Sequence, residues 1–166
     1  MKVIDHDNWL LADAPGREQV ADVRGWRQAF LGVRLDPCVP QDVARLFEAA
    51  RGSMLYSYFF QPLLISGVEQ CYRALEFGAR IRCAQLGVDV YCHDNRGKAH
   101  PLSFGHNLKL LAGQGLIDAS DLALWQQARE LREWVAVPAH QASLNQSHGI
   151  TALSRAAELL GRLFRN

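Results

Sequence analysis

Two arginines and two glutamates are interleaved at the start of the segment RELREWVAVPAH, residues 129–140. Arg129 and Arg132 are three residues apart, a spacing that makes side chains neighbours on a helix surface. Arginine is suited to bidentate recognition of phosphate or carboxylate groups, so the segment could hold a local anion site. Glu130 and Glu133 occupy an adjacent strip, and a solvated, charge-paired helix face is the alternative interpretation.

Histidines gather in a second part of the chain. His93, Asp94 and His100 fall in a polar segment rich in turn residues, and His106 follows closely. Such groups can bind a metal, but their spacing matches no established site pattern, and we expect no metal here. The sequence contains no GxGxxG, Walker, HExxH or GxSxG motif, and we expect no cofactor.

The cysteines and an aromatic cluster have structural interpretations. No two cysteines form a C-x-x-C pair, so we expect buried, reduced thiols and no structural zinc; they are Cys38, Cys71, Cys83 and Cys92. No basic residue occurs between residues 52 and 70, where four aromatic residues cluster: Tyr56, Tyr58, Phe59 and Phe60. We interpret the cluster as core or dimer interface rather than as a stacking platform for nucleic acid bases.

The elements that must position these residues are helices. Apolar residues recur at helical spacing through most of the chain, and no convincing strand is visible. The segment 88–101 is expected to be a loop, and 139–149 another. A break is expected at Pro62 because proline cannot continue a helix interior. The predicted helices cover residues 17–33, 40–51, 54–86, 103–115, 118–136 and 150–164. The sequence therefore predicts an all-α, up-and-down bundle of five or six helices.

Composition limits the partners. The chain has 166 residues, enough for one compact domain. Eighteen basic residues stand against 17 acidic ones, which gives a net charge of +1. Bulk electrostatic attraction to nucleic acid or to an anionic membrane is therefore not indicated. No apolar run is long enough for a membrane span and the first residues do not resemble a signal peptide, so we expect a cytoplasmic protein without a membrane partner.

Residues 67–164 resemble the HEPN family. The matching text is SGVEQCYRALEFGARIRCAQLG, then LLAGQGLIDASDLALWQQARELREWVAVPAHQ, then GITALSRAAELLGRLF. The family pattern has a long helix, a glycine-containing turn, a helix ending in Leu-Arg-Asn shortly before His-Pro, and a last amphipathic helix. The resemblance implies a HEPN-like helical bundle over residues 53–166 that pairs into a homodimer. Residues 1–52 would form a helical extension, which Trp9 and Trp26 would fasten to the bundle.

The resemblance also implies site residues. Catalytic members carry an arginine, a polar residue and, after four to six intervening residues, a histidine; two copies form a metal-independent ribonuclease site across the dimer. Here Arg132 matches the arginine, Glu133 stands where asparagine is common, and Val137 stands where the histidine is expected. Val137 cannot transfer a proton. The chain thus resembles a non-catalytic member, a binding or regulatory module with Arg132 near its dimer interface and Glu69 as a group that could orient Arg132.

Two alternatives remain open at this point. A ribonuclease of toxin or defence type would use Arg132 with His140, which lies after seven intervening residues, and would require the two side chains to converge on one phosphate. A helical protein with an unrelated small-molecule pocket is the other. A protein, an RNA or a nucleotide remains a possible partner of the homodimer.

Overall fold

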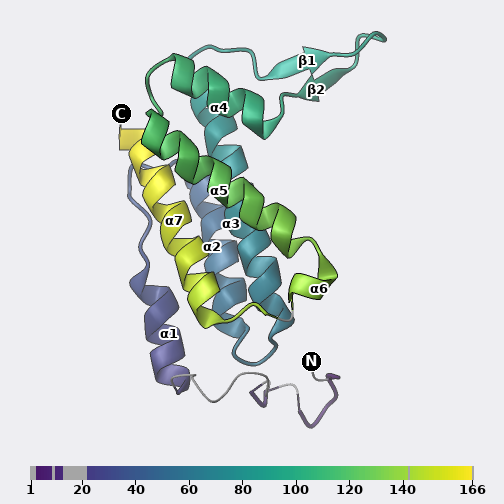
Figure 1. Cartoon of the computed structure of the whole chain (residues 1–166). Coiled ribbons are helices and arrows are strands. Elements are labelled where there is room, and N and C mark those ends of the chain that lie inside the picture. Colours follow the sequence, from purple (N-terminus) through teal and green to yellow (C-terminus); the bar gives the residue numbers. More distant parts are fainter. Residues whose placement is uncertain (1–2, 9, 13–21, 142, 166) are drawn as a thin grey trace.

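The computed structural model describes residues 3–8, 10–12, 22–141 and 143–165. Over these residues the protein is mostly helical, with seven helices and one two-stranded hairpin (Figure 1). The all-α prediction is confirmed, although the described residues hold one more helix than the upper number predicted. The helices are α1 (Val23–Gly32), α2 (Gln41–Tyr56), α3 (Pro62–Gln85), α4 (Phe104–Gly113), α5 (Ala119–Val135), α6 (Pro138–Gln141) and α7 (Gln146–Arg165).

Helix α1 is attached to the rest of the molecule through Trp26. The indole is buried, and its Nε1 donates to the carbonyl oxygens of Met54 and Leu55 at 3.1 Å each. Asp22 begins the helix as its N-cap by accepting a hydrogen bond from the backbone N–H of Gly25. The part of the predicted helix before residue 22, like Trp9, lies outside the described residues.

The boundary between α2 and α3 differs from the prediction. Helix α2 does not end at Gly52 but continues to Tyr56, so it crosses the boundary set between the extension and the bundle. A glycine inside a helix costs about 1 kcal/mol relative to alanine, and packing outweighs that cost here because Met54 is fully buried. Pro62 splits the predicted 54–86 helix and is the first residue of α3, where no backbone N–H is needed.

Helix α3 is the centre of the bundle. It packs against α2, α4, α5 and α7, which surround it in Figure 1. Small residues let two of these neighbours approach closely. A Cβ added at Gly67 would lie 3.0 Å from the backbone oxygen of Ala50 and 2.4 Å from Cγ of Met54, both on α2. A Cβ added at Gly78 would lie 2.5 Å from Cδ2 of Leu160 on α7.

The predicted loop over residues 88–101 is wrong in part, because it contains a β-hairpin. Strand β1 (Tyr91–His93) pairs antiparallel with β2 (Ala99–Pro101), with Tyr91 opposite Pro101. The turn is held by Asp94, whose Oδ1 accepts from the backbone N–H groups of Arg96 and Lys98. Both strands are exposed and only three residues long, too short to show the alternating pattern by which a strand is recognised.

The helices at the C-terminal end follow their capping residues. Ser103 caps α4 and Asp118 caps α5, so the predicted helices at 103–115 and 118–136 are confirmed within two residues. The predicted loop at 139–149 is wrong at both ends. Pro138 stops α5 but begins the single turn α6, and α7 begins at Gln146 rather than at Ile150.

The expected burial of the cysteines is wrong for two of the four. Cys71 and Cys83 lie in the core, whereas Cys38 and Cys92 are exposed. Cys38 lies in the connector before α2, where its Sγ is 3.7 Å from the carbonyl oxygen of Gly161 on α7, and Cys92 lies in the exposed hairpin. Within the described residues, none of the helices combines the length and the apolar character needed to cross a membrane.

The close approach of α2 and α3 gives a stability test. We expect Gly67→Ala to lower the free energy of unfolding by about 1–3 kcal/mol, because the added methyl group overpacks the contact with Ala50 and Met54. The same substitution at Gly52, where a Cβ meets nothing within 4 Å, should raise it by about 0.5–1 kcal/mol through helix propensity. Urea unfolding of both variants measures the two effects. Equal effects of the same sign would contradict the packing argument.

Asp36 gives a test of pH dependence. Hydrogen bonds from Cys38 and from Arg165, with the positive charge of Arg165, lower the pKa of this carboxyl group to about 2. The unfolded chain therefore binds a proton at higher pH than the native state does. This contribution to stability is complete above about pH 4 and is lost as the pH falls towards the native pKa. We expect Asp36→Asn to flatten the fall of the unfolding free energy over this range; an unchanged slope would show that other groups cause it.

Candidate functional site

Arg132 lies over the ring of Tyr72 where α5 crosses α3. The guanidinium carbon is 4.7 Å from the ring centroid, within the range of a cation–π interaction. The ring is held in turn by an edge contact with Phe104 of α4, at 5.2 Å between centroids, and Phe104 packs against Trp125 of α5 at 5.9 Å. Aromatic contacts among three helices thus fix the surface on which Arg132 rests.

On one side of this pair is an open hollow lined by charged residues of both signs, which we call the arginine hollow. Its lining residues are Tyr72, Glu76, Ser103, Phe104, Gly105, Arg129, Arg132, Glu133 and Ala136. The acids in it already have cationic neighbours. Arg129 Nε donates to Glu133 at 3.0 Å, and Glu76 lies 3.6 Å from Arg80. The bond to Glu133 raises the pKa of Arg129 and holds the pair together as the predicted charge-paired helix face.

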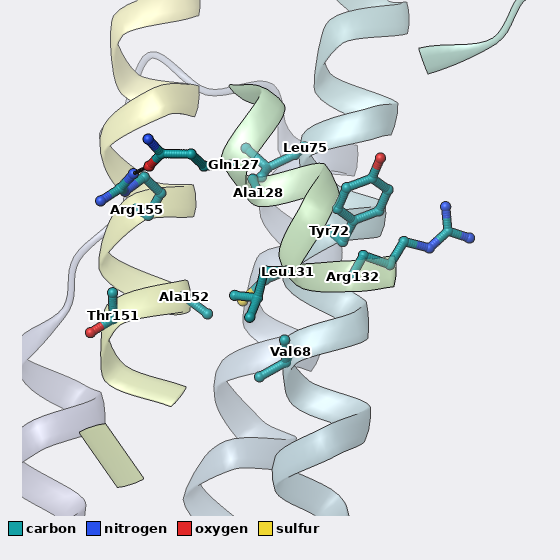
Figure 2. Close-up of a pocket in the computed structure, with 11 residues that line it drawn as sticks. Val68, Tyr72, Leu75, Gln127, Ala128, Leu131, Arg132, Thr151, Ala152 and Arg155 are labelled. Atoms are coloured by element: carbon teal, nitrogen blue, oxygen red, sulfur yellow. Dashed lines mark hydrogen bonds between the residues drawn. The ribbon is translucent and has the colours of Figure 1, made fainter. Parts of the chain in front are cut away.

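On the other side lies a cleft of about 220 Å³ between α3, α5 and α7, which we call the α3–α5–α7 cleft (Figure 2). Its lining residues are Val68, Cys71, Tyr72, Leu75, Gln127, Ala128, Leu131, Arg132, Thr151, Ala152 and Arg155. The lining is mostly apolar. At one edge, Arg155 Nη1 donates to Oε1 of Gln127 at 2.9 Å, and at the opposite edge Arg132 and Tyr72 stand side by side.

Two groups in the cleft are kept neutral by burial. Cys71 is buried, and desolvation raises the pKa of its thiol to about 12, so it is not a nucleophile at neutral pH. Burial also raises the pKa of Tyr72, against the opposing effect of Arg132 and Arg129, so its phenol group remains protonated. Neither group is therefore an ionised nucleophile at neutral pH.

The side chain of His140 packs against Trp134 rather than against Arg132. Its ring stacks on the indole of Trp134, with 4.7 Å between centroids and 10° between planes, and its Nδ1 is 3.0 Å from the carbonyl oxygen of Trp134. Residues 132 and 134 are about 200° apart around a helix of 3.6 residues per turn. The side chains of Arg132 and Trp134 thus leave α5 in nearly opposite directions, and the structure does not bring Arg132 and His140 together within one chain.

The remaining predicted residues lie apart from Arg132 or are paired with other groups. Val137 lies between α5 and α6 and is 43% exposed. Glu133 is bonded to Arg129. Glu69 is on α3, one turn before Tyr72, and lines neither the arginine hollow nor the α3–α5–α7 cleft.

Sequence reasoning missed Tyr72 and Glu76 as neighbours of Arg132. The two are four residues apart on α3 and so share one stripe with Glu69, seven residues before Glu76. That spacing shows that the three residues share a face of the helix. It does not show which of them lies opposite Arg132, because that depends on how far α5 is displaced along α3.

The histidine segment forms no metal cluster among the described residues. His100 pairs with Asp94 across the hairpin at 3.3 Å, and His106 lies on α4. The aromatic cluster is divided. Tyr58 packs between Trp26 and Phe59, at 5.9 and 5.2 Å, whereas Tyr56 is exposed.

Comparisons with family models, with curated proteins and with solved structures return no significant match to this chain.

The buried thiol of the cleft gives a chemical test. We expect iodoacetamide to modify Cys92 first in the native protein, Cys38 more slowly because burial and Asp36 raise its pKa, and Cys71 and Cys83 only after unfolding. The reason is that alkylation needs an accessible thiolate, which burial of Cys71 opposes. Mass spectrometry of peptides after a timed reaction measures this order. Modification of Cys71 at the rate of Cys92 would contradict the placement of Cys71 in the cleft.

Proposed function

We propose that this protein is a non-catalytic, HEPN-like helical module that acts in binding or regulation as a homodimer. The proposal rests on two positions of the sequence. The chain has Arg132 at the position of the family's arginine, and it has Val137 at the position of the family's histidine. RNA cleavage by that family needs a group that transfers a proton at the attacked or leaving oxygen. Val137 has no such group, and His140 is stacked on Trp134.

The arrangement of Glu133 supports the same conclusion. It stands where the family commonly has asparagine, and its carboxylate would repel a phosphodiester close to Arg132. Its bond to Arg129 also holds that guanidinium in an ion pair. The near-zero net charge of the chain adds no general attraction for RNA.

The end of α5 offers a surface for the second copy. Trp134 is 37% exposed and Val137 43% exposed, and they are three residues apart on the same stretch as Arg132. Exposed apolar side chains that lie together commonly mark an interaction surface. The HEPN resemblance implies a dimer contact in this region, where Trp134 and Val137 would bury apolar area and Arg132 would lie on the other side of α5.

The oligomeric state tests the proposal. We expect sedimentation to show a dimer, and we expect Val137→Asp to raise its dissociation constant by at least about tenfold, because a charge would be buried in an apolar contact. Leu31→Asp is the matched control, since Leu31 has the same exposed fraction, 43%, but lies on α1. A wild-type monomer, or equal weakening by both variants, would refute the dimer contact proposed here.

Incubation with RNA separates this proposal from the ribonuclease alternative. His140 of one copy could approach Arg132 of the other only across a dimer, so the dimeric protein must be used. We expect no cleavage of single-stranded RNA above the level of an Arg132→Ala variant. Cleavage that disappears in both Arg132→Ala and His140→Ala would establish the alternative and overturn the non-catalytic function.

A further inference from the structure

The α3–α5–α7 cleft has positively charged lining residues, and it is not part of the proposed dimer contact. Two arginines, Arg132 and Arg155, are among its lining residues, and no acid is. The arginine hollow, by contrast, contains Glu76 and Glu133 beside its arginines. We propose that the cleft binds a small apolar carboxylate, with the apolar part between the helices and the carboxylate at the guanidinium group of Arg155. This goes beyond the proposed function, since neither Val137 nor His140 lines the cleft.

The space sets the size of the ligand. Small side chains, Ala128 on α5 and Ala152 on α7, face larger ones from α3 and leave a cleft of about 220 Å³ (Figure 2). A cavity of about 150 Å³ holds benzene, so by proportion this one accommodates roughly nine non-hydrogen atoms. That is the size of one substituted ring or a short branched chain. Drug-sized ligands occupy about 300–1,000 Å³, and a nucleotide therefore does not fit.

The floor of the cleft favours an apolar body. Val68, Leu75 and Leu131 contribute aliphatic surface, and the neutral thiol of Cys71 adds no charge. Removing the apolar surface of a ligand from water is favourable in proportion to its area. The ring of Tyr72 at one edge offers an aromatic ligand an edge or offset contact.

The opposite edge is built to hold an anion. Arg155 extends from α7, and its guanidinium lies at this edge beside Gln127 of α5 (Figure 2). Gln127 accepts from Arg155 at 2.9 Å, which orients the guanidinium and uses one of its five N–H donors. A carboxylate can accept hydrogen bonds from the remaining N–H donors of the guanidinium. An amine would find a cation and no acid at this edge.

Benzoate and benzamide test the charge requirement, because they have the same size and differ in charge. We expect calorimetric titration to show benzoate binding at least about tenfold more tightly, the effect of hydrogen bonds between charged groups at a partly open site. Arg155→Gln should reduce benzoate to the affinity of benzamide. Arg24→Gln, which removes the same charge from the exposed surface of α1, should leave benzoate binding unchanged.

Ala128→Leu tests the location, since the larger side chain fills the cleft. We expect this variant to lose both ligands while sedimentation shows an unchanged dimer and circular dichroism an unchanged fold. Four results would overturn the proposal: no binding of benzoate at millimolar concentration, equal affinity for the two ligands, equal weakening by Arg155→Gln and Arg24→Gln, or full binding by Ala128→Leu. Loss of the dimer in Ala128→Leu would instead assign the cleft to a second copy of the chain. Dimerisation is measured separately with Val137→Asp, so failure of one proposal is distinguishable from failure of the other.

Discussion

The separation of α2 and α7 from α3 sets the dimensions of the bundle. A Cβ would lie 3.0 Å from the backbone oxygen of Ala50 if one were added at Gly67, and only a shift of the backbone could relieve that contact. At Gly149 on α7, a Cβ would lie 2.6 Å from the side chain of Leu64. Such contacts join α3 to both helices at several levels, among them Gly78, so a larger side chain at any of these positions would push the helices apart. Protein interiors are close-packed, and a fixed separation at these points leaves the other spaces in the bundle little freedom to close.

The position of α5 depends on how α2 and α7 pack against α3. Helix α5 packs on a face of α3 that Gly67 and Gly78 do not occupy. The contacts of Tyr72 with Phe104, and of Phe104 with Trp125, tie α5 to α3 through the aromatic side chain of α4. Arg132 then lies on Tyr72 and divides the surface into two parts of different character. The arginine hollow is lined by Glu76 and Glu133 as well as by arginines. The lining residues of the α3–α5–α7 cleft include two arginines and no acid. One cation–π contact therefore lies at the boundary between a charge-paired surface and an electropositive one.

Local signals predicted the helices well and the site poorly. Asp118 and Ser103 marked helix starts because a capping side chain bonds to its own next turn, which is a short-range effect. Gly52 wrongly predicted the end of α2. The unfavourable helix propensity of glycine is offset there by burial of side chains such as Met54 against other helices. The relation of Arg132 to Tyr72 rather than to Glu69 depends on the placement of α5 along α3, which no local pattern encodes. The exposure of Cys38 and Cys92 was missed for the same reason, since burial is a property of the whole fold, whereas the hairpin was missed because its strands are too short to show an alternating pattern.

Binding and catalysis place different demands on the end of α5. A guanidinium contributes charge and hydrogen-bond donors wherever it can reach an anion, and Arg132 keeps both while it rests on Tyr72. Proton transfer requires a titratable group at hydrogen-bond distance from the reacting oxygen, and in the HEPN-like alignment that we propose Val137 stands at that position. A ligand in the α3–α5–α7 cleft would contact Leu131, one turn before Val135 and Trp134. Such a ligand can change dimerisation only if it binds monomer and dimer with different affinity. Helix α5 carries residues of both surfaces, and is the element through which a difference of that kind would have to act.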